Sequence, residues 1–190
     1  AAEREMEEPI AVIWGNPPYS VGQKSANDNA QNQSYPALEA RIAATYAAKS
    51  DATNKNALYD SYIKAIRWAS DRVGEQGDRG GVVAFISNGA WIDGNSQAGL
   101  RRCLAAEFDT VHVLNLRGNC RTSGELRRQE GDNVFEIGSR TPIAITILTR
   151  LPRGRRTGEC RIFYHDIGDY LSREEKLDRL REWRSADAVE

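Results

Sequence analysis

The sequence contains few of the residues that bind metals or form disulfides. Its 190 residues include 3 cysteines and 2 histidines. Cys103, Cys120 and Cys160 are far apart in the chain and show no Cys-x-x-Cys spacing, so they form neither a zinc motif nor a disulfide framework. Since His112 and His165 are the two histidines, we expect no metal centre. An odd, unpatterned set of cysteines is typical of a reducing compartment.

Long apolar runs and an excess of one charge are also missing. No stretch has the roughly 20 apolar residues that cross a bilayer, and the acidic start AAEREMEEP is unlike a signal peptide. The 26 basic and 27 acidic residues give a net charge of −1. This balance does not decide for or against nucleic-acid binding, because local clusters set the field at a phosphate. We expect one compact domain in a soluble, cytoplasmic protein without a membrane partner.

Apolar periodicity predicts strands that alternate with helices. Predicted strands lie at 10–14, 81–87, 110–116 and 142–149, with an edge strand at 160–165. Predicted helices lie at 36–48, 57–73 and about 96–107, and a closing helix follows a capping box at Ser172 and Glu175. The second of these helices has an inward apolar stripe, Leu58, Tyr62, Ile66 and Ala69. Pro36 and Ser96 are the expected starts of the first and third helices. This alternation is typical of an α/β domain with a mostly parallel sheet.

The first predicted strand is a continuous apolar run that stops at Gly15. Such a run is typical of a strand that is buried on both faces in the interior of a parallel sheet. We therefore expect neighbouring strands on both sides of it. On this interpretation the chain begins in the middle of a domain.

Directly after this strand the chain reads Asn16-Pro17-Pro18-Tyr19. The carboxyl end of a strand in an open α/β sheet is where ligands bind. An exocyclic amino group on a base is a poor nucleophile, because its lone pair is delocalised into the ring. The Asn16 side-chain oxygen and the Pro17 carbonyl oxygen can accept hydrogen bonds from such an amine and favour a nitrogen that attacks a methyl group.

The two prolines and the tyrosine complete this predicted catalytic motif. Pro17 and Pro18 fix two φ angles and hold Asn16 extended, so the two acceptors are aimed in advance. Tyr19 offers a flat face on which an extruded base can stack. The competing interpretation is a rigid turn at a strand exit, where prolines are common.

The segment GNPPYS (15–20) resembles the fourth motif of amino-methyltransferases that use S-adenosylmethionine. The resemblance extends from about Pro9 to Leu177 and is to the methyltransferase region of single-chain type ISP restriction-modification enzymes. Four further segments carry it: NALYDSYIKAIRWASDRV (56–73), GVVAFISNGAWIDG (81–94), EFDTVHVLNLRGNCRTSGE (107–125) and YHDIGDYLSREEKL (164–177). In that family one polypeptide joins a nuclease, an ATP-driven translocase, this methyltransferase and a recognition domain.

The resemblance implies the fold, the reaction and the partners. It implies a Rossmann-like methyltransferase core represented by its C-terminal half, with residues 1–168 in the catalytic domain and 169–190 leading to a recognition domain. It implies N6-methylation of a flipped adenine in double-stranded DNA, with Asn16, Pro17, Pro18 and Tyr19 as the catalytic residues. ATP and magnesium would serve the other domains.

The family places a glycine-rich loop for S-adenosylmethionine upstream of this motif. Residues 1–13 contain no glycine, so we identify no cofactor-binding residue in the chain. We expect the chain by itself to be inactive.

Two groups of arginines are candidate DNA contacts. Arg117 and Arg121 lie in a predicted loop at 117–133 that also carries acidic residues. A contact with phosphate or with a neighbouring domain is one interpretation, and a solvated, salt-bridged loop is an equally good one. The second group is Arg153, Arg155 and Arg156. A solvated turn is favoured over a DNA contact there.

Two further features are candidates for contact with a flipped base: one is suggested by related enzymes, and the other by its place next to the motif in the sequence. Phe135 is a candidate for packing against the flipped base, although an ordinary core role is favoured. The polar loop 22–33 either closes over a flipped base or is merely flexible.

Two other functions remain open. The same chemistry can act on a glutamine side chain of a protein or on a base in RNA, and the motif alone does not separate these from DNA. Alternatively, the chain is a noncatalytic module that docks DNA or couples the domains of a helicase-nuclease.

Overall fold

The computed structural model describes residues 10–19, 34–74, 79–135 and 139–185, so the predicted loop 22–33 lies outside the described residues. Its strands are β1 (Val12–Gly15), β2 (Gly81–Asn88), β3 (Thr110–Arg117), β4 (Ile143–Arg150) and β5 (Arg161–Asp166). Its α-helices are α2 (Pro36–Ile42), α3 (Ser61–Gly74), α4 (Ala98–Glu107), α5 (Gly124–Glu130) and α6 (Arg173–Trp183). Short π- or 3₁₀-helical segments are η2 (Ala43–Ala47), η3 (Asn56–Tyr59), η4 (Gly89–Trp91) and η5 (Arg153–Arg155).

The strands form one sheet in the order β1-β2-β4-β3-β5. The β1–β2 and β3–β5 pairs are parallel, whereas β4 pairs antiparallel with both β2 and β3. Four strands therefore run in one direction and β4 in the other, which confirms a mostly parallel sheet. The carboxyl ends of those four strands meet at one edge of the sheet, hereafter the carboxyl edge. The opposite side is the amino edge.

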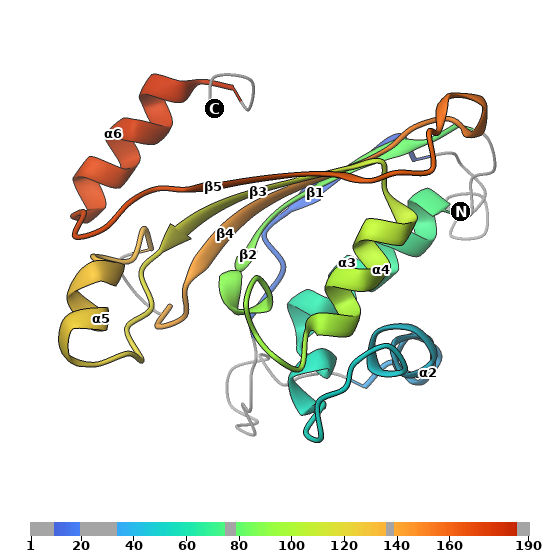
Figure 1. Ribbon diagram of the computed structural model, residues 1–190, viewed down its shortest axis with the longest axis horizontal. Helices are drawn as coiled ribbons and strands as arrows, with labels where there is room; N and C mark the ends of the chain where they lie inside the picture. The colour runs from blue at the N-terminus through green and yellow to red at the C-terminus, as the bar shows by residue number, and fades with distance from the viewer. Residues whose placement is uncertain (1–9, 20–33, 75–78, 136–138, 186–190) are drawn as a thin grey trace.

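Helices α3 and α4 cover one face of the sheet, α2 packs against α3 on the side away from the strands, and α6 lies over part of the other face (Figure 1). The predicted inward stripe of the second helix is confirmed, because Tyr62, Ile66 and Ala69 are buried on α3. They pack with inward strand residues such as Val83 and Leu148 in the main core. This layered α/β arrangement is compatible with a Rossmann-like fold.

A second, smaller hydrophobic cluster lies at the carboxyl edge. Its buried members are Leu116, Ile143, Ile167 and Leu171, from β3, β4 and the segment between β5 and α6. We call these four residues the edge cluster. It holds together the segments that follow β3 and β5, where several candidate site residues lie.

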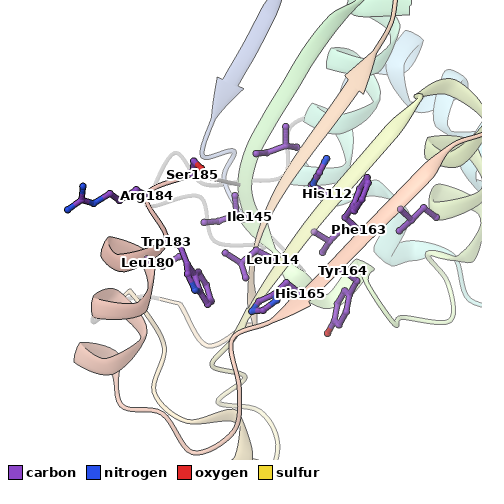
Figure 2. A pocket seen from close by; sticks show the side chains of 13 residues that line it. His112, Leu114, Ile145, Phe163, Tyr164, His165, Leu180, Trp183, Arg184 and Ser185 are labelled. Atoms are coloured by element: carbon purple, nitrogen blue, oxygen red, sulfur yellow. The ribbon is translucent and has the colours of Figure 1, made fainter. Parts of the chain in front are cut away.

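The sheet face that carries α6 is open and apolar near β1. Trp14 aligns across the strands with Ala84, Ile147, His112 and Phe163, and its side chain is 81% exposed. Between α6 and the strands this face forms a hollow of about 530 Å³ (Figure 2). In its wall His112 stacks on Phe163 with ring centroids 4.4 Å apart.

The prediction that the first strand is buried on both faces is therefore wrong for the described chain. Within the described residues β1 has a neighbouring strand on one side only, and Val12 is 57% exposed. An apolar run indicates that a strand can be buried, but the tertiary structure determines which elements cover it.

Two boundary predictions are corrected and one is confirmed. Ser96 does not cap the third helix: α4 begins at Ala98 after Gln97, and the Ser96 hydroxyl donates to the Gln97 side-chain oxygen instead. The predicted loop at 117–133 contains the short helix α5. The capping box is present, with the Ser172 side chain accepting from the Glu175 amide and Glu175 accepting from Ser172.

Within the described residues, none of the helices combines the length and the apolar character that crossing a membrane requires.

Candidate active site

The segment Asn16 to Tyr19 leaves β1 at the carboxyl edge of the sheet. Asn16 and Pro18 are exposed, Pro17 is buried and Tyr19 is half-buried. The two prolines fix their own φ angles, and Asn16, directly before them, is exposed. The motif therefore presents a polar acceptor to solvent from a rigid turn.

A hydrogen bond links the Asn16 and Tyr19 side chains of the motif. The Tyr19 hydroxyl donates to Asn16 Oδ1 at 2.7 Å and lies 3.3 Å from the Ile86 carbonyl oxygen on β2. Because an amide oxygen has two lone pairs, Asn16 Oδ1 can accept a second hydrogen bond from a ligand. The contact fixes which way the Asn16 oxygen faces.

The Tyr19 ring lies between the two hydrophobic clusters. It packs against the main core and the edge cluster, and it meets the Tyr62 ring edge-on at a centroid distance of 6.4 Å. Burial raises the pKa of Tyr19 to about 12, so the hydroxyl stays a neutral donor at physiological pH. Its position next to the apolar clusters leaves a half-buried aromatic surface at the motif.

Phe135 lies on the same edge cluster as Tyr19. It packs against that cluster and is half-buried. Its backbone N–H donates to Asn133 Oδ1 at 2.9 Å. The structure therefore brings together two aromatic residues that are 116 positions apart, counted from Tyr19 to Phe135.

Arg117 and Arg121 also lie at the carboxyl edge, but their environments differ. Arg117 is 22% exposed and is paired through Nε with Asp166 and through a terminal nitrogen with Asp169, each at 2.6 Å. Arg121 is exposed. Arg117 therefore joins β3 to the segment after β5, and Arg121 is the better placed of the two for an external contact.

Arg153, Arg155 and Arg156 lie at the amino edge of the sheet, in the turn between β4 and β5 (upper right in Figure 1). Arg156 pairs with the buried Asp109 at 3.2 Å, whereas Arg153 and Arg155 are exposed. The fold thus places this group at the end of the strands opposite Asn16. The two candidate arginine groups do not form one surface around the motif.

Sequence reasoning missed the asparagines that position three of the candidates. Asn115, Asn119 and Asn133 each accept, through the side-chain oxygen, the backbone N–H two residues later. Those later residues are Arg117, Arg121 and Phe135. The asparagine two positions before each candidate is the signal that predicts such Asx turns.

The described residues contain no cluster of side chains with metal-ligand character. Over the described ranges no group of three or more His, Cys, Asp or Glu side chains is arranged to hold a metal ion. At the carboxyl edge, the turn after β1 carries two prolines, and Asn88 at the end of β2 uses its side-chain oxygen to cap η4 at the Ala90 N–H. We assign no residue of the chain to S-adenosylmethionine.

Three solved structures that contain segments similar to this chain are DNA complexes. A nuclease-deletion mutant of the type ISP restriction-modification enzyme LlaGI with a DNA substrate mimic is 46% identical over 99% of this chain, with a TM-score of 0.88. The ATP-dependent type ISP restriction-modification enzyme LlaBIII bound to DNA is 40% identical over 98% (TM-score 0.87). The DrdV–DNA complex is 37% identical over 100% (TM-score 0.86).

The chain spans 12–18% of the length of those three proteins. No protein-family model matches it. No curated protein matches it either.

Proposed function

We propose that the chain is part of the methyltransferase region of a restriction-modification polypeptide of the type ISP kind, and that this polypeptide methylates the N6 amino group of adenine in double-stranded DNA. The observation that carries the proposal is the Tyr19–Asn16 pair. Asn16 follows the carboxyl end of a sheet strand and is exposed. Its amide oxygen is oriented by a 2.7 Å hydrogen bond from the half-buried Tyr19. The similarity to three DNA-bound proteins, two of them type ISP enzymes, supports DNA as the substrate.

In this mechanism the chain prepares the amine for attack. Asn16 Oδ1 and the Pro17 carbonyl oxygen accept hydrogen bonds from the two N–H groups of the flipped adenine, which favours a tetrahedral nitrogen with an available lone pair. Tyr19 keeps the Asn16 oxygen in position and presents its ring to the base. S-adenosylmethionine supplies the electrophilic methyl group when bound, held by parts of the polypeptide other than the residues described above.

The proposal also defines the partners of the chain. Double-stranded DNA is the substrate, and nuclease, translocase and recognition domains of the same polypeptide act with the methyltransferase in a restriction-modification system. ATP and magnesium act in those domains.

The test is the substitution Asn16→Ala in the native polypeptide, assayed by transfer of a tritiated methyl group to DNA, RNA and protein. Loss of one preorganised polar contact to the reacting group lowers kcat by about 10²–10³-fold in comparable cases, and we expect a fall of that order with DNA binding retained. Asn54→Ala is the matched control, because Asn54 makes an exposed Asx turn to the Asn56 N–H far from the motif in sequence.

Each other outcome rejects part of the proposal. Unchanged methylation by Asn16→Ala means that the motif is a scaffold and that the chain is a noncatalytic module. Label that enters only protein or only RNA means that the chemistry is right and the substrate is wrong.

A further inference from the structure

The two faces of the sheet are covered to different extents. On the face under α3 and α4, the inward side chains of Val83 and Leu148 are each 1% exposed. On the opposite face one row of side chains crosses all five strands: Trp14, Ala84, Ile147, His112 and Phe163. We call these five residues the open row.

The open row has an exposed aromatic residue at each end. Trp14 on β1 is 81% exposed, and Phe163 on β5 is 44% exposed. Val12 lies two positions before Trp14, on the same face of β1, and is 57% exposed. Neighbouring apolar side chains that are left in water mark a surface that packs against a partner.

The hollow of about 530 Å³ lies beside the open row, between α6 and the sheet. Leu180 and Trp183 of α6 face Leu114 and His165 across it (Figure 2). The Trp183 ring meets the His165 ring edge-on, with the ring centroids 4.9 Å apart. Because the wall is apolar and aromatic, and the described residues that line it include no Asp or Glu, the hollow suits a bulky apolar side chain.

The open row is wider than one helix. A mostly parallel sheet is typically covered by helices on both faces, and among the described residues α6 is the helix over this face. Neighbouring strands lie about 4.8 Å apart, so the row is about 19 Å wide, whereas a helix with its side chains is about 10 Å across. The face therefore has room for another helix beside α6.

Length and charge indicate where this helix comes from and what it carries. The chain spans 12–18% of the length of the three similar proteins, so most of such a polypeptide lies outside the chain. Two exposed arginines lie at this face: Arg184 lines the hollow, and the Arg161 guanidinium lies over the Phe163 ring, 5.7 Å from its centroid. Acidic side chains on the flank of the helix would complement both arginines.

We propose that an amphipathic α-helix from another part of the same polypeptide packs on the open row. It inserts a bulky apolar side chain into the hollow beside α6 and places acidic residues next to Arg161 and Arg184. This inference rests on the proposed function only in that the chain is one segment of a longer polypeptide. It does not depend on methyl transfer.

The experiment places the photo-crosslinking residue p-benzoylphenylalanine at position 163 of the native polypeptide, where it retains an aromatic ring. Position 68 is the matched control, because Trp68 on α3 is 47% exposed, against 44% for Phe163. After irradiation with and without DNA, mass spectrometry identifies the crosslinked peptides. We expect position 163 to crosslink, within one molecule, to an amphipathic segment outside the chain, and position 68 not to reach that segment.

The other crosslinking results overturn the proposal. A crosslink from position 163 to a second copy of the polypeptide or to DNA identifies a different occupant of the open row. Absence of an intramolecular crosslink means that the row stays open in the native polypeptide. Equal crosslinking of one segment from positions 163 and 68 means that the contact is not specific to this face.

Hydroxyl-radical footprinting of the wild-type polypeptide tests the same point without a variant. If the helix covers the open row, Trp14 should oxidise about 5-fold more slowly than Trp68, because the centre of an interface excludes water. Equal or faster oxidation of Trp14 overturns the proposal. Methyl transfer to DNA is measured on the same sample: protection of Trp14 without methylation rejects the proposed reaction and supports the helix.

Discussion

At the scale of the single residue, the Tyr19 hydroxyl can donate its proton to either of two acceptors. Which acceptor it uses determines how the Asn16 oxygen is held. The shorter contact is to Asn16 Oδ1 at 2.7 Å, and the longer one is to the Ile86 carbonyl oxygen at 3.3 Å. A single hydrogen is shared between them or occupies the shorter contact. The Asn16 oxygen is therefore oriented within the chain itself, and the Ile86 carbonyl oxygen of β2 is an alternative acceptor for the Tyr19 hydroxyl.

Tyr19→Phe should keep the ring and remove this hydrogen bond. We expect a loss of unfolding free energy of about 0.5–1.5 kcal/mol near neutral pH. Burial raises the pKa of Tyr19 from its ordinary value of 10.0 to about 12. The contribution of the tyrosine to the unfolding free energy is therefore constant below pH 10 and is lost as the pH rises towards 12. Urea unfolding of the wild type and of Tyr19→Phe between pH 8 and pH 11.5 measures this contribution. A difference in unfolding free energy that stays constant over that range would contradict the raised pKa of Tyr19.

At the scale of the element, a buried lysine is one of the side chains that attach α6 to the rest of the fold. The Lys176 ammonium donates to the carbonyl oxygens of Leu116, Glu130 and Asp132 at 2.7–2.9 Å, and the residue is 0% exposed. Burial lowers the pKa of Lys176 to about 8, opposed by the nearby Glu130 and Asp132 carboxylates. All three N–H donors are used, so one side chain links α6 to the ends of β3 and α5.

Lys176→Met should fill a similar space and leave those carbonyl oxygens without their partner. We expect the unfolding free energy to fall by about 2–4 kcal/mol, because each buried acceptor that is left unsatisfied is costly. Lys55→Met is the control, since Lys55 donates to a single carbonyl oxygen, that of Ala47 at 2.7 Å. Thermal and urea unfolding measure both variants, and equal losses would show that Lys176 does not act as an anchor.

At the scale of the whole molecule, the two edges of the sheet separate the candidate arginines. Asn16, Tyr19 and the exposed Arg121 belong to the carboxyl edge, whereas Arg155 lies in the exposed turn at the amino edge. If DNA enters at the carboxyl edge, as proposed, a phosphate contact is expected from the first group.

Arg121→Gln should therefore weaken DNA binding by about 2–5-fold and reduce the slope of log K against log salt by about 1, as expected for one lost phosphate contact. Arg155→Gln should change neither quantity. Binding isotherms of the native polypeptide at four salt concentrations provide the measurement. A larger effect from Arg155 would place the DNA at the amino edge.

The local sequence was sufficient for most of the elements. The stripe of Tyr62, Ile66 and Ala69 predicted the buried face of α3, and Ser172 with Glu175 predicted the start of α6, because both signals act within a few residues. The order and direction of the strands were less accessible. An apolar run does not show which elements pack against it. The sequence therefore predicted a buried β1, whereas Trp14 is 81% exposed.

The sequence by itself determined which chemistry is available at the motif, since Asn16, Pro17 and Tyr19 carry their acceptors, rigidity and ring wherever the chain places them. Only the tertiary structure decided the surroundings of these residues. In the fold, Phe135 packs on the edge cluster together with Tyr19, and the Arg153–Arg155 turn lies at the amino edge of the sheet. The physical reason is range. Propensities, caps and proline restraints act over a few residues. The Arg117–Asp166 pair joins residues 49 positions apart, and the cluster shared by Tyr19 and Phe135 joins residues 116 positions apart. Such contacts form only when the strands have paired in their final register.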